Sequence, residues 1–164
     1  MKNFNIILLL LLSLSFIGCE KKVHEGPYNV HFDRDLCAEC RMVISDRNYV
    51  AQLVDNTHSE AYNFDDIGCL FLWLQEHNDS WIQEANIYIA DVKSAKFLEA
   101  KKAFWSQGHT TPMDFGLAAH ERKPEGKLIG YEEAKKIALT PKPEKSNSMK
   151  CGPGKCGGNK CGAK

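Results

Sequence analysis

The clearest β-pattern in the chain lies between residues 49 and 64. Residues 49–54 are rich in β-forming side chains, and residues 59–64 return as a second such run. The polar cluster 55–58 between them is typical of a turn. This segment therefore predicts an antiparallel hairpin.

A helical period follows the hairpin directly. Four apolar residues recur at helical spacing: Ile67, Leu70, Phe71 and Leu74. Asp65 precedes them as the expected N-cap, with Asp66 as an acidic residue in the first turn. The helix should end near Glu76, and residues 86–92 alternate as a further strand. The first unit is thus predicted as ββαβ.

The second half repeats this pattern more weakly. Residues 97–105 fit a helix by their Ala and Lys content, yet Phe104-Trp105 could instead close a strand. Three further elements are expected: a loop at 110–116, a strand at 117–120 and an amphipathic helix at 131–139. The pattern thus predicts an α+β fold class, with the ββαβ unit followed by a weaker β-β-α unit and a disordered Cys/Gly/Lys-rich C-terminal tail.

The N-terminus is typical of an exported protein. Residues 1–18 combine basic Lys2 with an apolar run that is too short for a comfortable membrane span. The sequence Phe16-Ile17-Gly18-Cys19 is similar to a bacterial lipobox, which implies cleavage before Cys19 and acylation of its thiol and amino group. We therefore expect a periplasm-facing membrane lipoprotein; a plain secretory signal with an incidental Cys19 is the alternative.

The remaining chain divides into a tether at 19–30, one folded domain at 31–140, and a linker with a Cys-rich tail at 141–164. Lys and Arg number 21, equal to Asp and Glu at 21, so no overall field favours nucleic acid as a partner. No nucleophile–base pair, carboxylate dyad or phosphate loop is visible in the sequence. These observations favour a binding protein over an enzyme.

The chemistry concentrates in Cys37-Ala38-Glu39-Cys40-Arg41-Met42, where two thiols and a thioether occur within six residues. Soft sulfur ligands suit Cu(I). On an extended segment Cys40 and Met42 would point the same way and could hold one ion. Cys37 is either a further ligand or a partner that oxidises with Cys40. A disulfide, a redox pair and half of a zinc site therefore stay open as alternatives.

More distant residues could complete such a site. Met113 lies in a loop with Pro112 rather than in a helical stripe, and His120 and His109 are candidate imidazole donors. Asp91 could orient such a ligand. Cys69 lies in the predicted helix, one position away from the apolar Leu70, and is interpreted as a small buried hydrophobic residue rather than a redox group.

The tail repeats a cysteine every five residues, at Cys151, Cys156 and Cys161, with Gly and Lys between them. Adjacent lysines would favour the thiolate form. We interpret the tail as a flexible arm that captures copper and raises its local concentration for the domain. A zinc-binding arm and a tail that merely oxidises are the alternatives.

Across residues 31–140 the chain resembles the NosL family of lipoproteins. The matching segments are Cys37–Met42, Tyr49–Gln52, Phe64–Cys69 and Thr111–Met113. The resemblance implies a small α+β fold of two related ββαβ-type units with antiparallel strands. It further implies a periplasm-facing copper chaperone that binds one Cu(I) and supplies nitrous oxide reductase, directly or through its membrane-associated maturation machinery. Arg41 and Asp114 stand where the family commonly has glycine.

Three hypotheses follow. The first is a lipid-anchored Cu(I) metallochaperone whose ion is held by Cys40, Met42 and Met113. The second is a membrane-tethered thiol–disulfide oxidoreductase that uses Cys37 and Cys40. The third is a passive metal-sequestering lipoprotein whose active part is the tail.

Overall fold

The computed structural model describes residues 26–141, so Cys19 and the three tail cysteines lie outside the described residues. The element order is β1 (Ala51–Asp55), β2 (Glu60–Phe64), α2 (Ile67–Glu76), the 3-10 helix η2 (Ser80–Glu84), β3 (Asn86–Ala90), β4 (Phe97–Glu99), β5 (Phe104–Gln107), β6 (Leu117–His120) and α3 (Tyr131–Leu139). This order confirms the α+β class. Within residues 26–141, none of the helices has the length and apolar character needed to span a membrane.

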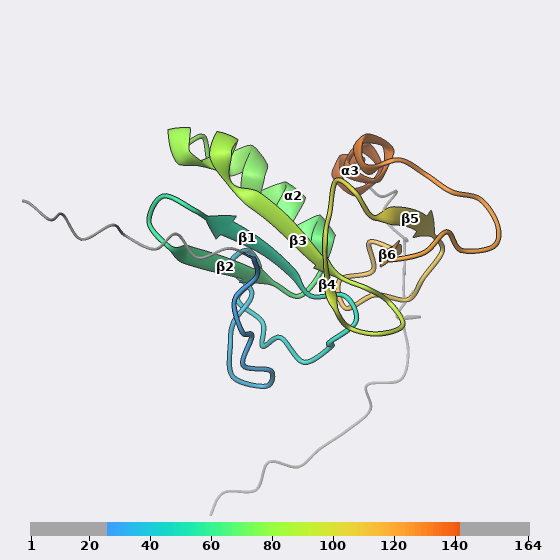
Figure 1. Ribbon diagram of the computed structural model, residues 1–164, viewed down its shortest axis with the longest axis horizontal. Coiled ribbons are helices and arrows are strands. Elements are labelled where there is room, and N and C mark those ends of the chain that lie inside the picture. Colours follow the sequence, from blue (N-terminus) through green and yellow to red (C-terminus); the bar gives the residue numbers. More distant parts are fainter. Residues whose placement is uncertain (1–25, 142–164) are drawn as a thin grey trace, which may run out of the picture.

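The larger sheet has four antiparallel strands in the order β2-β1-β3-β4. Ala51 pairs with Phe64 and Asp55 with Glu60, which confirms the predicted hairpin. Figure 1 shows α2 crossing one face of this sheet. All five residues of β1 are buried, because α2 packs on the strand and the N-terminal segment reaches it at Gln52.

The second unit consists of β5, β6 and α3, beside the first (Figure 1). A parallel bridge between Asp91 and Ala119 joins its two-stranded sheet to the end of β3, and α3 packs against α2. This β-β-α order confirms the weaker repeat seen in the sequence. Among the described residues no strand follows α3, so only the first unit has the full ββαβ order.

Residues 97–105, which fit either a helix or a strand by sequence, hold two short strands separated by a turn. β4 ends at Glu99 and β5 begins at Phe104. The Trp105 indole is fully buried, and its Nε1 donates a hydrogen bond to the Ala100 carbonyl at 3.0 Å. Burial of this large side chain outweighs the helix propensity of the neighbouring Ala and Lys residues.

The N-terminus of α2 is capped by Asp66, not by Asp65 as the sequence predicted. The Asp66 backbone is extended, and its carboxylate accepts a hydrogen bond from the Gly68 N–H at 3.1 Å. The same carboxylate accepts hydrogen bonds from the Thr111 hydroxyl and from the Met113 N–H, the latter at 3.3 Å. Asp66 therefore joins the start of α2 to the loop that precedes β6.

Close packing at Gly68 gives a first prediction. A Cβ atom at this position would lie 2.1 Å from the Phe115 ring, so Gly68→Ala forces the loop and the helix apart. We expect a loss of about 1–3 kcal/mol in the free energy of unfolding, measured by urea denaturation. The control is Gly130→Ala, where no atom lies within 4 Å of the new methyl group. An equal loss in both variants would contradict the packing argument.

Candidate metal centre

The Cys-rich segment forms a tight hairpin loop. The Cys37 N–H donates a hydrogen bond to the Met42 carbonyl at 2.8 Å, and the Arg41 N–H donates to the Cys37 carbonyl at 3.0 Å. Arg41 has a φ of 64°, in the left-handed region. Because the chain turns here, the argument that strand alternation points Cys40 and Met42 the same way is wrong.

Four potential ligands from three parts of the fold meet at this loop: Cys37, Cys40, Asp65 and Cys69. Their ligand atoms all lie within 4.8 Å of one another, and the Cys40 sulfur is 3.8 Å from each carboxylate oxygen of Asp65. Cys37, Asp65 and Cys69 are 0%, 3% and 1% exposed, whereas Cys40 is partly exposed. We call this group the Cys/Asp cluster, and it is accessible from the Cys40 side.

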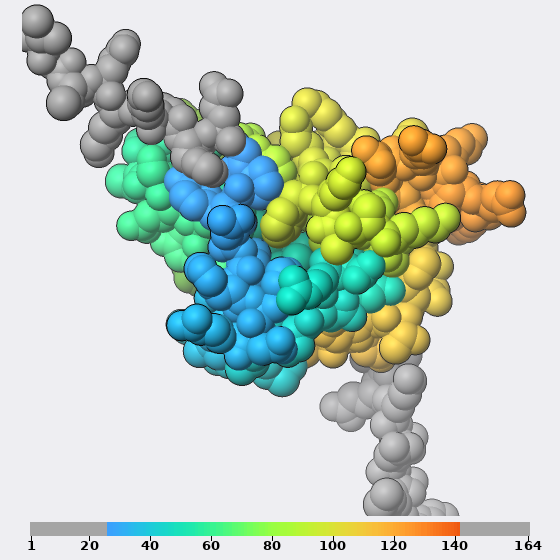
Figure 2. Space-filling model, turned by 60° about the horizontal axis from the view of Figure 1, so that its bottom comes forward, coloured from blue at the N-terminus to red at the C-terminus, as the bar shows by residue number. Residues whose placement is uncertain are grey.

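The junction between β2 and α2 assembles the Cys/Asp cluster. Asp65 follows β2 directly, and Cys69 lies in the first turn of α2, so the chain reversal brings both to one end of the sheet. The hairpin loop is attached there because the Ala38 N–H donates to the Asn63 carbonyl at 2.8 Å. Figure 2 shows the N-terminal segment and the loop, in blue, together on one face of the molecule.

The charges in the cluster suit a cation. Among residues 26–141, no ion pair joins Asp65 to a Lys, Arg or His side chain. All three cysteines of this part of the chain are free thiols. A buried carboxylate among sulfur atoms, without a cationic side chain beside it, favours a bound metal ion as the neutralising charge.

Hydrogen bonding and burial shift the pKa values of the three thiols in different directions. The Cys69 thiol donates to Cys37, and this bond, helped by backbone groups of the loop, lowers the pKa of Cys37 to about 6. Burial raises the pKa of Cys40 to about 11, and the bond to Cys37 raises the pKa of Cys69. Among the three thiols, the thiolate form is therefore favoured at Cys37.

The two predicted thioether ligands come from segments that adjoin the Cys/Asp cluster. The Met113 N–H is bonded to Asp66, the residue after Asp65, and the Met113 side chain is half-buried against the core. Met42 is 47% exposed on the hairpin loop. Their roles as ligands stay predictions.

The two histidines meet at a hydroxyl in the second unit. The Nε2 atoms of His120 and His109 lie 2.7 and 2.8 Å from the Ser106 Oγ. Burial lowers the pKa of His120. His120 does not belong to the four-residue group. Asp91, expected to orient such a ligand, instead accepts hydrogen bonds from backbone N–H groups, including that of Glu121 at 2.8 Å.

Sequence reasoning missed Asp65 and Cys69 as members of the cluster. Cys69 is a buried core residue, as expected, and its thiol is in addition bonded to Cys37. The available signal was an acidic residue and a cysteine four positions apart, across a strand-to-helix junction. Helical periodicity alone assigned Cys69 to packing.

Three thiols and a carboxylate in one small group form a soft-ligand site that could hold a metal ion. The NosL family model matches residues 29–120, more than half of the chain, and the protein belongs to the NosL family. No curated protein matches the sequence. The matched range contains the whole Cys/Asp cluster and Met113. The family and the cluster together indicate a copper-related function.

Both departures from the family pattern coincide with left-handed backbone. Arg41 has a φ of 64° and Asp114 a φ of 58°. Glycine adopts this conformation freely, whereas a side chain such as that of arginine is strained by about 1 kcal/mol. The hairpin loop and the Met113 loop thus keep a conformation suited to glycine without having glycine.

The lowered pKa of Cys37 gives a second prediction. We consider the chain with Cys151→Ser, Cys156→Ser and Cys161→Ser, called the tail-Ser protein below. Without metal and fully reduced, its ultraviolet thiolate absorbance should rise with an inflection near pH 6. Because the ordinary thiol pKa is 9.0, the free energy of unfolding should increase between pH 6 and 9 and level off below pH 6.

Single substitutions identify the thiol that gives this inflection. Cys69→Ala removes the thiol donor and should move the inflection upward, whereas Cys40→Ser should leave it near pH 6. An inflection that persists in Cys37→Ser would contradict the assignment to Cys37.

Proposed function

We propose that the protein is a lipid-anchored Cu(I) metallochaperone that delivers copper to nitrous oxide reductase, directly or through its membrane-associated maturation machinery. The observation that carries this proposal is the Cys/Asp cluster. Three sulfur atoms and one carboxylate within 4.8 Å can reach one ion after small side-chain rotations. Thiolate sulfur prefers Cu(I) among the copper states.

The distribution of exposure suits a carrier. Cys37, Cys69 and Asp65 are buried, so they protect the ion from water. Cys40 is partly exposed, and an acceptor can reach the ion by replacing this ligand first. Exposed Met42 adds a neutral thioether sulfur on the same loop. Unlike a thiol, this sulfur does not form disulfides.

The thiol–disulfide oxidoreductase has less support. An attacking thiol needs both access and thiolate character. Cys37 has the lowered pKa but is 0% exposed, whereas Cys40 is accessible but has a pKa raised to about 11. Because the two properties belong to different residues, neither is a good nucleophile.

The proposals about the lipid anchor, the copper acceptor and the tail rest on the sequence and on family membership. The Phe16–Cys19 segment supports lipidation and a periplasm-facing location, and family membership supports nitrous oxide reductase as the client. The Cys-rich tail supports an auxiliary copper-capturing role. We propose that the tail collects the ion and the domain delivers it.

Copper titration of the tail-Ser protein tests the main proposal. In an anaerobic competition assay we expect one tightly bound Cu(I) per chain. Cys37→Ser, Cys40→Ser and Cys69→Ser should each weaken binding by at least about 100-fold, because each removes a ligand. Met42→Ala and Met113→Ala test the thioethers, and Met149→Ala is the matched control, which should bind normally.

Other outcomes identify the alternatives. A tail-Ser protein that binds no copper, when the unaltered chain does, would assign the chemistry to the tail. Disulfide turnover that survives Met42→Ala would support the oxidoreductase. Displacement of Cu(I) by equimolar Zn²⁺ would make the cluster a zinc site.

The anchor has a separate test. Cys19→Ser should release the protein from the membrane fraction, because the lipidated thiol is then absent. Replacement of Met149 again serves as the control. A Cys19→Ser protein that stays membrane-bound would contradict the lipid anchor and leave the copper site unaffected.

A further inference from the structure

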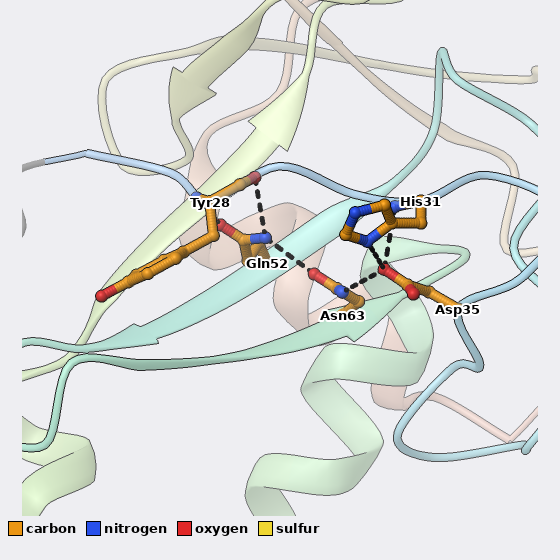
Figure 3. Close-up of polar contacts among 5 residues, drawn as sticks. All are labelled: Tyr28, His31, Asp35, Gln52 and Asn63. Atoms are coloured by element: carbon orange, nitrogen blue, oxygen red, sulfur yellow. Dashed lines mark hydrogen bonds and ion pairs between the residues drawn. The ribbon is translucent and has the colours of Figure 1, made fainter.

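A pair of hydrogen-bonded amide side chains, Gln52 and Asn63, lies between the N-terminal segment and the hairpin loop, with Gln52 buried and Asn63 partly buried (Figure 3). Gln52 in β1 is 0% exposed and pairs directly with Asn63 in β2. Its Nε2 donates to Asn63 Oδ1 at 2.7 Å and to the Tyr28 carbonyl at 3.3 Å, while its Oε1 accepts from the Tyr28 N–H at 2.7 Å. Both amide hydrogens and the oxygen of this buried glutamine are thus used.

Asn63 extends this network to the segment that carries Cys37. Its Nδ2 donates to Asp35 Oδ2 at 3.2 Å, and its backbone carbonyl accepts from the Ala38 N–H at 2.8 Å. The same Asp35 oxygen accepts from the His31 N–H at 2.9 Å (Figure 3). Asn63 therefore holds the chain on both sides of Cys37.

Packing alone does not explain these polar residues. A fully buried position in a central strand ordinarily favours an apolar side chain, because buried amides are costly unless every group is bonded. The hydrogen bonds of the Asn63 side chain go to Gln52 and Asp35, neither of which belongs to the Cys/Asp cluster. The network thus acts on the cluster only through the backbone that it holds.

We propose that Asn63, oriented by Gln52, is a positioning residue that sets the geometry of the Cys37–Cys40 loop for copper binding. The inference rests on the proposed copper function but concerns residues that are not ligands. Supporting groups fix ligand orientation, and their loss typically weakens metal binding by about 10–100-fold. Gln52 is in turn held by the backbone of Tyr28, so the start of the described chain also helps to orient Asn63.

Exchanging the hydrogen-bond donor Asn63 and the acceptor Asp35 tests the positioning role of Asn63. In the tail-Ser protein, Asn63→Asp removes the amide donor and places a second carboxylate against Asp35. We expect Cu(I) affinity to fall by about 10–100-fold. In the double variant Asp35→Asn/Asn63→Asp, the new amide can donate to the new carboxylate, and Gln52 and the His31 N–H keep acceptors. The net charge is unchanged, and most of the affinity should return.

A control at the opposite end of the same hairpin separates positioning from stability. Asp55 is 3% exposed, and its carboxylate accepts hydrogen bonds from the N–H groups of Thr57 and His58. Asp55→Asn should lower the Tm and leave copper affinity unchanged.

The alkylation rate of Cys40 in metal-free protein, resolved by peptide mass spectrometry, is a readout independent of copper. It should change in Asn63→Asp and return in the double variant.

The outcomes decide the proposal. Unchanged affinity and unchanged Cys40 reactivity in folded Asn63→Asp, or equal copper losses in Asp55→Asn, would overturn it. If the tail-Ser protein binds no Cu(I), the proposed function fails, and Cys40 alkylation alone decides the positioning role. If circular dichroism shows that Asn63→Asp does not fold, Asn63→Ala takes its place, because it removes the donor without adding a charge.

Discussion

The buried carboxylate of Asp66 is the interaction on which the rest of the structure depends. It caps α2 through Gly68 and binds the loop of the second unit through Thr111 and Met113. Burial raises the pKa of this carboxyl above its ordinary value, although the three hydrogen bonds act in the opposite direction. The start of α2 and the Met113 loop are thereby fixed to one point, between the two units of the fold.

Four consecutive residues, the last two of β2 and the two that join it to α2, have four different tasks. Asn63 holds the hairpin loop, Phe64 is fully buried in the core, Asp65 faces the thiols and Asp66 caps the helix. Because these residues are consecutive, a shift of the helix start by one position would change all four environments. The placement of Asp65 and Cys69 in the Cys/Asp cluster therefore depends on where α2 begins, although two of the thiols come from a loop.

The potential ligands of the Cys/Asp cluster differ in exposure. The buried ligands limit solvent access, and the loop with Cys40 and Met42 is the part that a partner can reach. Left-handed Arg41 directs the chain back toward the core after Cys40. The site thus combines buried residues at the junction of β2 and α2 with a surface loop that carries the more exposed sulfur atoms.

The sequence by itself determined the β1–β2 hairpin, the extents of α2 and α3 and the strand β6, and it identified Cys37 and Cys40 as candidate metal ligands. Hydrophobic periodicity and sulfur-rich spacing are local properties, so they can be recognised in the sequence. The tertiary structure decided that Cys69 and Asp65 join those thiols, that Asp66 is the cap and that the segment from Cys40 to Met42 turns. It also decided that His120 bonds Ser106 outside the cluster. These features depend on where one chain reversal places a helix terminus against a distant loop, and no periodicity along the sequence contains that information.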